Sequence, residues 1–145
     1  MNRKAFTLVE ILIVVIILGI LAAIVIPQFS EASDDARRSS MISDLQTVRS
    51  QLELYRVEHG VYPDGGTVAA WQAQLTGKTA QDGTAGTDYG PYLGTFPTNP
   101  FNDDNGVVLD DGSSSAGAAS TDTGWYFDSS TGKFAANDSV AHGAL

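Results

Sequence analysis

The chain has 145 residues, with 17 acidic against 8 basic side chains and a formal net charge of −9, and its length suits about one domain. From residue 61 onward ten aspartates stand against only two lysines, a balance that repels the phosphates of nucleic acid. The absence of cysteine excludes disulfides, thiolate metal sites and a cysteine nucleophile.

The first feature along the chain is an apolar segment that follows a short basic start. Residues 11–30 hold no charged side chain, and as a helix they would extend about 30 Å, which is the thickness of a bilayer's hydrocarbon core. Arg3 and Lys4 precede this segment, and the next basic residue is Arg37. The positive-inside tendency therefore predicts that Met1 lies in the cytoplasm and that the acidic bulk of the chain lies outside it.

A cleaved secretory signal is the alternative interpretation of this segment. It would use a cut after Ala32, with the small residue Ser30 at the −3 place. Against it, the uncharged run is longer than the usual apolar core of about 7 to 15 residues, and Glu10 stands near its beginning. A carboxylate in hydrocarbon costs on the order of 3 kcal/mol and persists where a partner relieves that cost. Glu10 therefore calls for a specific explanation.

The residues around Glu10 carry a family resemblance. Residues 3–14 read Arg-Lys-Ala-Phe-Thr-Leu-Val-Glu-Ile-Leu-Ile-Val, which closely resembles the N-terminal motif of type IV pilins and type II secretion pseudopilins. The resemblance implies that a prepilin peptidase cuts between Ala5 and Phe6 and methylates the new terminal Phe6. The family usually has glycine where this chain has Ala5. Glu10 matches the family's glutamate, whose implied role is to pair with the terminal amine of a neighbouring subunit.

Gly19 and Pro27 match the helix-weakening pair of the same family. Proline within a helix removes an amide donor and crowds the carbonyl four residues back, here that of Ala23. In similar filaments this stretch partly unwinds, and a simple kink is the alternative.

An amphipathic helix is predicted after Pro27. Its apolar face consists of Ile42, Leu45, Val48, Leu52 and Tyr55. On the other side Arg49 and Glu53, four residues apart, are expected to form a solvated pair. Gly60 supplies a stop, so the helix is predicted over residues 6–58. A domain this small cannot cover such a helix, so half of it must be buried by lipid and then by other copies of the chain in a helical filament.

From residue 61 the chain is expected to form a loop-rich head. Short strands are predicted at 107–109, 124–127 and 133–135, the last two as a hairpin whose loop ends in Gly132. A short helix or turn is predicted at 71–75. The expected core is aromatic and consists of Tyr62, Tyr92, Phe96, Trp125, Phe127 and Phe134. The predicted fold class is α+β, with a long N-terminal α-helix packed on a small antiparallel sheet, as in pilins.

The head carries a second, weaker resemblance. Residues 90–101 and 124–128 resemble the distal part of major pseudopilins and related bacterial pilins, and the missing cysteine pair points away from pilins with a disulfide-closed loop. Major pseudopilins hold calcium in a distal loop, which implies a Ca²⁺ site that uses Asp103, Asp104, Asp110 or Asp111. The spacing does not fit an EF-hand, and a soluble surface loop is the alternative.

The predicted organisation has four parts. These are a leader at 1–5, a transmembrane and filament-core helix at 6–30, the amphipathic second half of the helix at 31–59, and an acidic head at 60–145. The precursor is expected to cross the inner membrane once, with the head outside the cytoplasm, and then to enter a periplasmic pseudopilus or a cell-surface pilus. The expected partners are the prepilin peptidase, an inner-membrane assembly platform, minor pilins and further copies of the chain.

The sequence therefore predicts a structural subunit of a type IV pilus-like filament or a type II secretion pseudopilus. The alternatives are a membrane-tethered monomer that binds Ca²⁺ or another ligand, and a secreted protein with a cleaved signal. An enzyme is not expected, because no nucleophile and base stand at a recognised spacing and His59 and His142 are isolated in the sequence.

Overall fold

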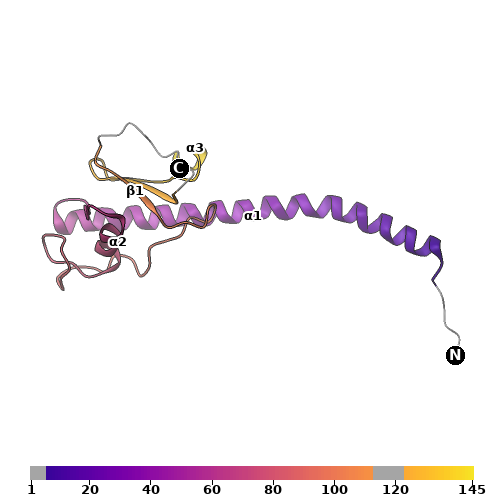
Figure 1. Cartoon of the computed structure of the whole chain (residues 1–145), viewed down its shortest axis with the longest axis horizontal. Helices are drawn as coiled ribbons and strands as arrows, with labels where there is room; N and C mark the ends of the chain where they lie inside the picture. Colours follow the sequence, from indigo (N-terminus) through magenta and orange to yellow (C-terminus); the bar gives the residue numbers. More distant parts are fainter. Residues whose placement is uncertain (1–5, 113–122) are drawn as a thin grey trace, which may run out of the picture. The chain divides into compact units, whose positions relative to one another are not determined.

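The computed structural model describes residues 6–112 and 123–145 of the chain. Its longest element is α1, an α-helix over Leu8–His59 (Figure 1). The helix predicted over residues 6–58 is thus confirmed to within two residues at each end. The chain divides into two compact units, Met1–Arg37 and Arg38–Leu145, which are described separately below.

The first unit consists of the apolar half of α1. All side chains from Leu8 to Ile26 are exposed in the single chain. The helix passes through Gly19 and Pro27 without a break. The unwinding expected between these two residues is therefore not a property of the isolated chain, and it stays a prediction for the assembled filament.

The second unit combines the remainder of α1 with the head. After α1 ends, Thr67 opens a second helix, α2 over Val68–Thr76, and its hydroxyl oxygen accepts a hydrogen bond from the Ala70 amide at 3.3 Å. This is the N-cap arrangement that satisfies one of the amide groups left open at a helix start. The segment predicted as a short helix or turn is therefore a helix.

A three-stranded sheet completes the head, in the order β1-β2-β3. The strands are β1 over Val107–Asp110, β2 over Trp125–Asp128 and β3 over Lys133–Ala136. The predicted hairpin is confirmed, since β2 and β3 pair antiparallel across a loop that ends in Gly132, whose φ is 75°. The prediction of an antiparallel sheet was wrong for β1, which runs parallel to β2. A parallel pair requires a long connection, and the chain between β1 and β2 provides one.

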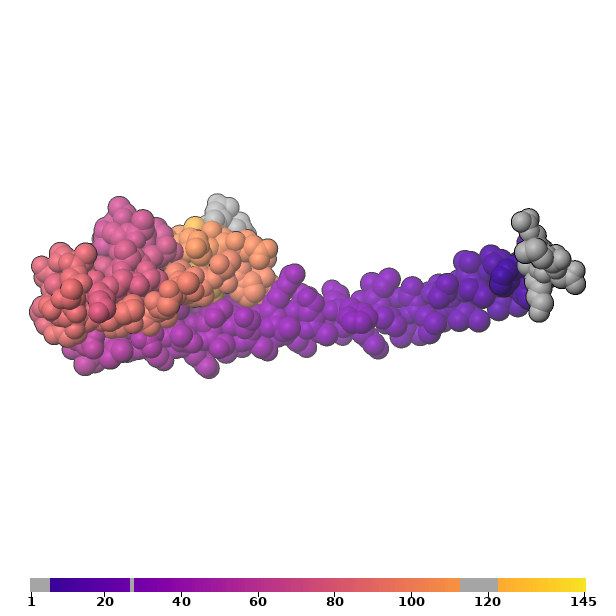
Figure 2. All heavy atoms as spheres, turned by 90° about the horizontal axis from the view of Figure 1, so that it is seen from below, coloured from indigo at the N-terminus to yellow at the C-terminus, as the bar shows by residue number. Residues whose placement is uncertain are grey.

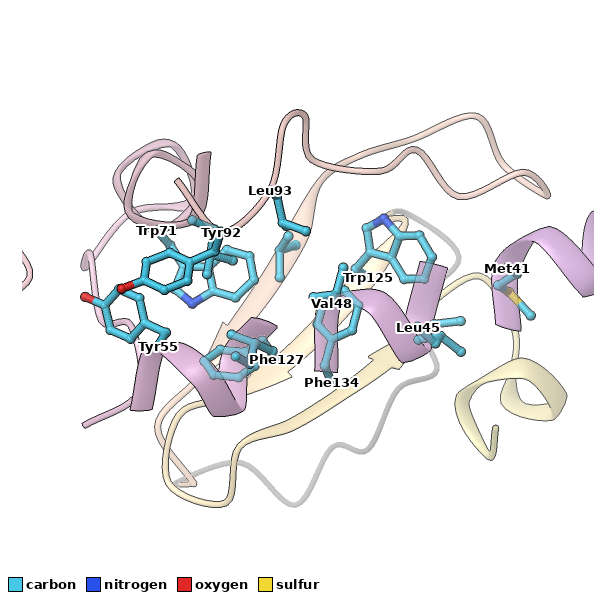
Figure 3. Close-up of a cluster of buried hydrophobic side chains, with 14 residues drawn as sticks. Met41, Leu45, Val48, Tyr55, Trp71, Tyr92, Leu93, Trp125, Phe127 and Phe134 are labelled. Atoms are coloured by element: carbon cyan, nitrogen blue, oxygen red, sulfur yellow. The ribbon is translucent and has the colours of Figure 1, made fainter. Parts of the chain in front are cut away.

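The core lies between α1 and the head (Figure 3). Trp71 of α2 is 0% exposed, and its ring lies 5.0 Å from that of Phe127 and 5.5 Å from that of Phe96. The predicted helix face is confirmed for Leu45, Val48, Leu52 and Tyr55, which are buried, whereas Ile42 is only partly buried and its neighbour Met41 lies in the core instead. Of the predicted head aromatics, Tyr92, Trp125, Phe127 and Phe134 are buried, whereas Tyr62 and Phe96 pack against the core and are partly buried.

Arg49 departs from the expectation of a solvated ion pair with Glu53. Its Nε and Nη2 both donate to the backbone carbonyl of Phe134, at 2.9 and 2.7 Å, and its Nη1 donates to the carbonyl oxygen of Leu145 at 3.1 Å. Glu53 instead accepts a hydrogen bond from Tyr62 at 2.7 Å. The sequence spacing placed Arg49 correctly on the helix but did not indicate that the head folds back over it.

A four-residue helix near the end of the chain, α3 over Val140–Gly143, was not predicted. The Ser139 side chain caps it by accepting a hydrogen bond from the His142 amide at 3.2 Å. The serine before a short helix is a recognisable signal, but four residues are too few for a hydrophobic period.

Candidate assembly helix and processing site

Thr7 and Glu10 form a reciprocal cap at the start of α1. The Thr7 amide and hydroxyl both donate to Glu10 Oε2 at 2.8 Å, and the Glu10 amide donates to Thr7 Oγ1 at 3.2 Å. This is a capping box, in which two side chains satisfy amide groups that a helix start leaves open. The sequence analysis did not predict this capping role of Thr7. The signal was present, because a threonine followed three residues later by glutamate is the known signature of a capping box.

The cap gives Glu10 a hydrogen-bonding role within its own chain. Both bonds from Thr7 reach one oxygen of the carboxylate, and an ionised carboxylate can accept about four hydrogen bonds in all. The cap is thus compatible with a further donor such as an amine. The predicted pairing of Glu10 with a neighbour's terminal amine stays a prediction.

Phe6 lies just before α1 and is 80% exposed. Ala5, on the other side of the predicted cut, lies outside the described residues. The helix begins at Leu8, so the backbone of Phe6 is not part of its hydrogen-bonded ladder. A bond before Phe6 would therefore be cut without opening a helical turn.

The apolar half of α1 offers a large surface to its surroundings. Within the part of the chain that the structure describes, α1 is the one helix long and apolar enough to cross a membrane, and none of its most apolar stretch is buried. The exposed side chains include Ile11, Ile16, Leu18 and Ile24. So much exposed aliphatic surface is unstable in water and requires lipid or other protein around it.

The four aspartates proposed for calcium lie at opposite ends of β1. Asp103 and Asp104 precede the strand, whereas Asp110 is its last residue and Asp111 follows it. A four-residue strand places the two pairs about 10 Å apart along the backbone. Within residues 6–112 and 123–145 no three acidic or histidine side chains converge in a way that could hold a metal ion.

The carboxylates of Asp104 and Asp110 have partners within the head. Asp104 Oδ2 accepts a hydrogen bond from the Gly124 amide at 2.9 Å. Asp110 accepts from the Gly112 amide at 3.0 Å and from the Tyr126 hydroxyl at 2.7 Å. Burial, together with this bond to Asp110, raises the pKa of Tyr126 to about 12. Both aspartates thus join β1 to neighbouring segments, and calcium binding stays a prediction.

The two histidines lie in separate polar clusters. His59 is buried at the end of α1, where its Nδ1 lies 3.1 Å from the Gln81 carbonyl oxygen and its Nε2 lies 3.0 Å from the Tyr92 hydroxyl. Burial raises the pKa of Tyr92 well above its usual value. His142 pairs with Asp138 four residues before it. The ring of His59 thus connects the end of α1 to the head, and the ring of His142 connects α3 to the residue before its cap.

The comparisons with known proteins agree with this geometry. The model of the prokaryotic N-terminal methylation motif matches residues 1–26, and the model of type II secretion system protein G matches residues 28–114. The type II secretion system core protein G of Klebsiella pneumoniae is 30% identical over 71% of this chain and 72% of its own length. The protein of the same name from Pseudomonas aeruginosa is 31% identical over 69% of each chain. No solved structure matches.

The methylation motif covers the Phe6 and Glu10 region, and the protein G model covers the second half of α1 and most of the head as far as β1. The chain therefore belongs to the protein G family of type II secretion systems, the structural pseudopilins.

Proposed function

We propose that the chain is made as a single-pass inner-membrane precursor, cut between Ala5 and Phe6, methylated on Phe6 and then assembled into a periplasmic pseudopilus. The observation that carries this proposal is the exposed apolar half of α1, which begins immediately after the predicted cut. Removal of residues 1–5 leaves this helix in the mature chain. The same helix can then lie in lipid before assembly and among its copies afterwards.

Glu10 is the residue proposed to guide the transfer from membrane to filament. In lipid its charge is costly, and its pairing with the terminal amine of Phe6 in a neighbouring copy would relieve both charges at once. The capping contact with Thr7 holds the Glu10 carboxylate in the first turn of α1, next to the new terminus. Assembly is therefore favoured when the two charges meet.

The proposed partners are the prepilin peptidase, an inner-membrane assembly platform and minor pseudopilins, in addition to copies of the chain. They follow from membership of the protein G family and from a membrane-anchored start. The filament itself needs no catalytic residue in this chain, and we propose a structural role without an enzymatic one.

Filament assembly in a cell tests the proposal. The full-length chain is produced in a bacterium that carries a type II secretion system but lacks its own protein G. Sheared filaments that contain the chain, together with restored secretion, are the expected result. If the wild-type chain stays in the inner membrane and no filament contains it, the proposal is wrong.

A further inference from the structure

The segment before β1 contains the one Asn-Gly pair of the chain, Asn105-Gly106. An asparagine side chain can close a five-membered ring with the main chain when the amide nitrogen of the next residue reaches its Cγ. Glycine in the next position favours this reaction, because it has no Cβ to obstruct the approach and its backbone takes up many conformations. This pair is therefore the most reactive asparagine dipeptide that the sequence offers.

The structure leaves the Asn105 side chain accessible. Asn105 is exposed and lies in irregular backbone between the bridge of Asp104 to Asn99 and the start of β1. Its main-chain carbonyl accepts a hydrogen bond from Gln72 Nε2 at 2.7 Å, but its side-chain amide forms no hydrogen bond with the described residues. In Figure 2 the segment around β1, coloured orange, forms part of the visible surface of the head. Water and the neighbouring backbone can thus both reach the side chain.

The amide of Gly106 is available as the attacking group. Among the described residues no acceptor is bonded to it, whereas the Gly106 carbonyl accepts a hydrogen bond from the Trp125 amide at 2.9 Å. A Cβ at this position would lie 2.8 Å from Asp104 Oδ2, which the Gly124 amide holds in place. The packing of Asp104 therefore requires glycine after Asn105, so the fold itself maintains the reactive pair.

The other described asparagines are protected by their surroundings. Asn99 and Asn137 are 0% and 2% exposed, and both side-chain amides donate hydrogen bonds. Asn99 is also followed by Pro100, which has no amide N–H. The Asn102 side chain is held at both ends, because its nitrogen donates to a main-chain carbonyl at 3.1 Å and its oxygen accepts from a main-chain amide at 3.3 Å. Structure and sequence thus single out Asn105.

We propose that Asn105 is a site of spontaneous deamidation. The amide nitrogen of Gly106 loses its proton and forms a bond to Cγ of Asn105. The bond from Cγ to Nδ2 breaks, ammonia leaves with that proton, and a succinimide ring remains. One water molecule then opens the ring at either of its carbonyl carbons and gives aspartate or isoaspartate. Water is the co-reactant, and no group is oxidised or reduced.

Either product changes the segment before β1. Aspartate adds a negative charge directly after Asp103 and Asp104. Isoaspartate also lengthens the main chain by one methylene group between two anchored carbonyls, those of Asp104 and Gly106, each of which accepts a main-chain hydrogen bond at 2.9 Å. Isoaspartate is therefore expected to loosen the start of β1 more than aspartate does.

Peptide mapping of the aged full-length chain tests the proposal. The chain is incubated in detergent at pH 8, and fragmentation in the mass spectrometer locates each deamidated residue. Deamidation at Asn105 is expected to be at least tenfold faster than at Asn102, and slower at pH 6, where the Gly106 amide loses its proton less often. The chain unfolded in urea gives the rate of the dipeptide without the fold. If the folded chain keeps Asn105 while the unfolded chain loses it, or if Asn102 reacts as fast in the folded chain, the proposal is wrong.

The variant Asn105→Gln gives an independent readout. Glutamine carries its amide one methylene farther out, so attack by Gly106 would have to close a less favourable six-membered ring. The change removes no side-chain hydrogen bond within the described residues, so the head should keep its fold and its Tm before ageing. Ammonia release from Asn105→Gln is expected to be at least tenfold lower than from the wild-type chain. Equal release from both chains would place the reaction elsewhere and overturn the proposal. None of these results depends on filament assembly, so the pseudopilus function is tested separately.

Discussion

Arg49 of α1 holds the backbone carbonyl of Phe134 with two N–H groups, at 2.9 and 2.7 Å. Phe134 lies in β3, the edge strand of the sheet, and its side chain is buried against Trp71 and Trp125. The guanidinium thus covers a carbonyl on the open edge of β3 and joins the helix to the strand farthest from it in sequence. This contact fixes the sheet on the second half of α1.

Replacement of Arg49 by alanine should therefore destabilise the head. The expected loss is about 2 kcal/mol, because hydrogen bonds to charged groups contribute about 1.5 to 3 kcal/mol and the Phe134 carbonyl would lose its donors. Arg49→Lys should recover only part of the loss, since an ammonium group lacks the planar fork. Denaturant unfolding of the detergent-solubilised chain measures both variants.

Arg56, seven residues later on α1, is the matched control. Its guanidinium lies 3.9 Å from Glu53, donates a hydrogen bond to the Tyr62 hydroxyl at 3.0 Å and stands over the Tyr62 ring. Because the side chains of Arg56 and Glu53 are more than half exposed, Arg56→Ala should cost about 1 kcal/mol, less than Arg49→Ala. Equal losses for the two alanine variants would show that the bond to Phe134 has no special importance.

Local patterns in the sequence predicted more of this structure than long-range pairing did. The buried face of α1 and the hairpin of β2 and β3 depend on spacing and on a turn that Gly132 permits, and both were confirmed. The parallel pairing of β1 depends on the path of a long connection, and the role of Arg49 depends on residues 85 and 96 positions away. Neither leaves a periodic signal.

In the candidate site, too, local sequence patterns were easier to interpret than contacts between distant residues. The family motif around Phe6 and Glu10 was recognisable in the sequence, and the model of the methylation motif matches residues 1–26. The calcium set rested on the resemblance to major pseudopilins, and spacing in the sequence did not indicate that Asp104 lies before β1 whereas Asp110 ends it. The Thr7 cap was a local signal that went unused because the family resemblance already explained Glu10.

The variants Glu10→Gln and Thr7→Val separate the two proposed roles of Glu10 in filament assembly, namely its capping of α1 and its negative charge. Glutamine also serves at this place in a capping box, so Glu10→Gln keeps the helix start and removes only the charge. If pairing with the terminal amine drives assembly, Glu10→Gln should abolish filaments, whereas Thr7→Val should fray the first turn and reduce their yield only several-fold. Filament yield by electron microscopy, with the membrane level of each variant as the control, measures the difference.

The opposite order, with Thr7→Val the more damaging variant, would mean that helix capping rather than charge is the role of Glu10. Equal filament yields from Glu10→Gln and the wild-type chain would rule out the charge pair altogether.

Asp128 should make the stability of the hairpin depend on pH. Bonds from the hydroxyl groups of Ser130 and Thr131 lower its pKa from 3.8 to about 2. Because the folded pKa lies below the unfolded one, the carboxylate contributes its full stabilisation above about pH 4 and loses it as the pH falls towards 2. Asp128→Ala should lower Tm by a few degrees at pH 7 and by progressively less below pH 4.

Thermal unfolding of both chains between pH 2 and 7 measures this trend. Asp88→Ala is the control, since Asp88 accepts only a long 3.5 Å bond from Thr87 among the side-chain contacts of the described residues. A Tm difference between Asp128→Ala and the wild-type chain that stays constant down to pH 2 would contradict the assigned pKa.

The calcium hypothesis is tested by comparing the end of β1, where Asp111 follows the strand, with its start, where Asp103 lies before it. About millimolar Ca²⁺ is then expected to raise Tm of the full-length chain, and Asp111→Asn should remove that effect. Asp103→Asn, at the other end of the strand, should leave it intact. The absence of both binding heat and any rise in Tm would end the calcium hypothesis.

The mass of the mature N-terminus tests the central claim most directly. The chain is isolated from the membranes of a cell that has a prepilin peptidase, and its N-terminal peptide is sequenced by mass spectrometry. The account predicts a peptide that begins with N-methylated Phe6 and retains the whole of α1. An intact Met1, or a chain that begins at Ser33, would contradict it.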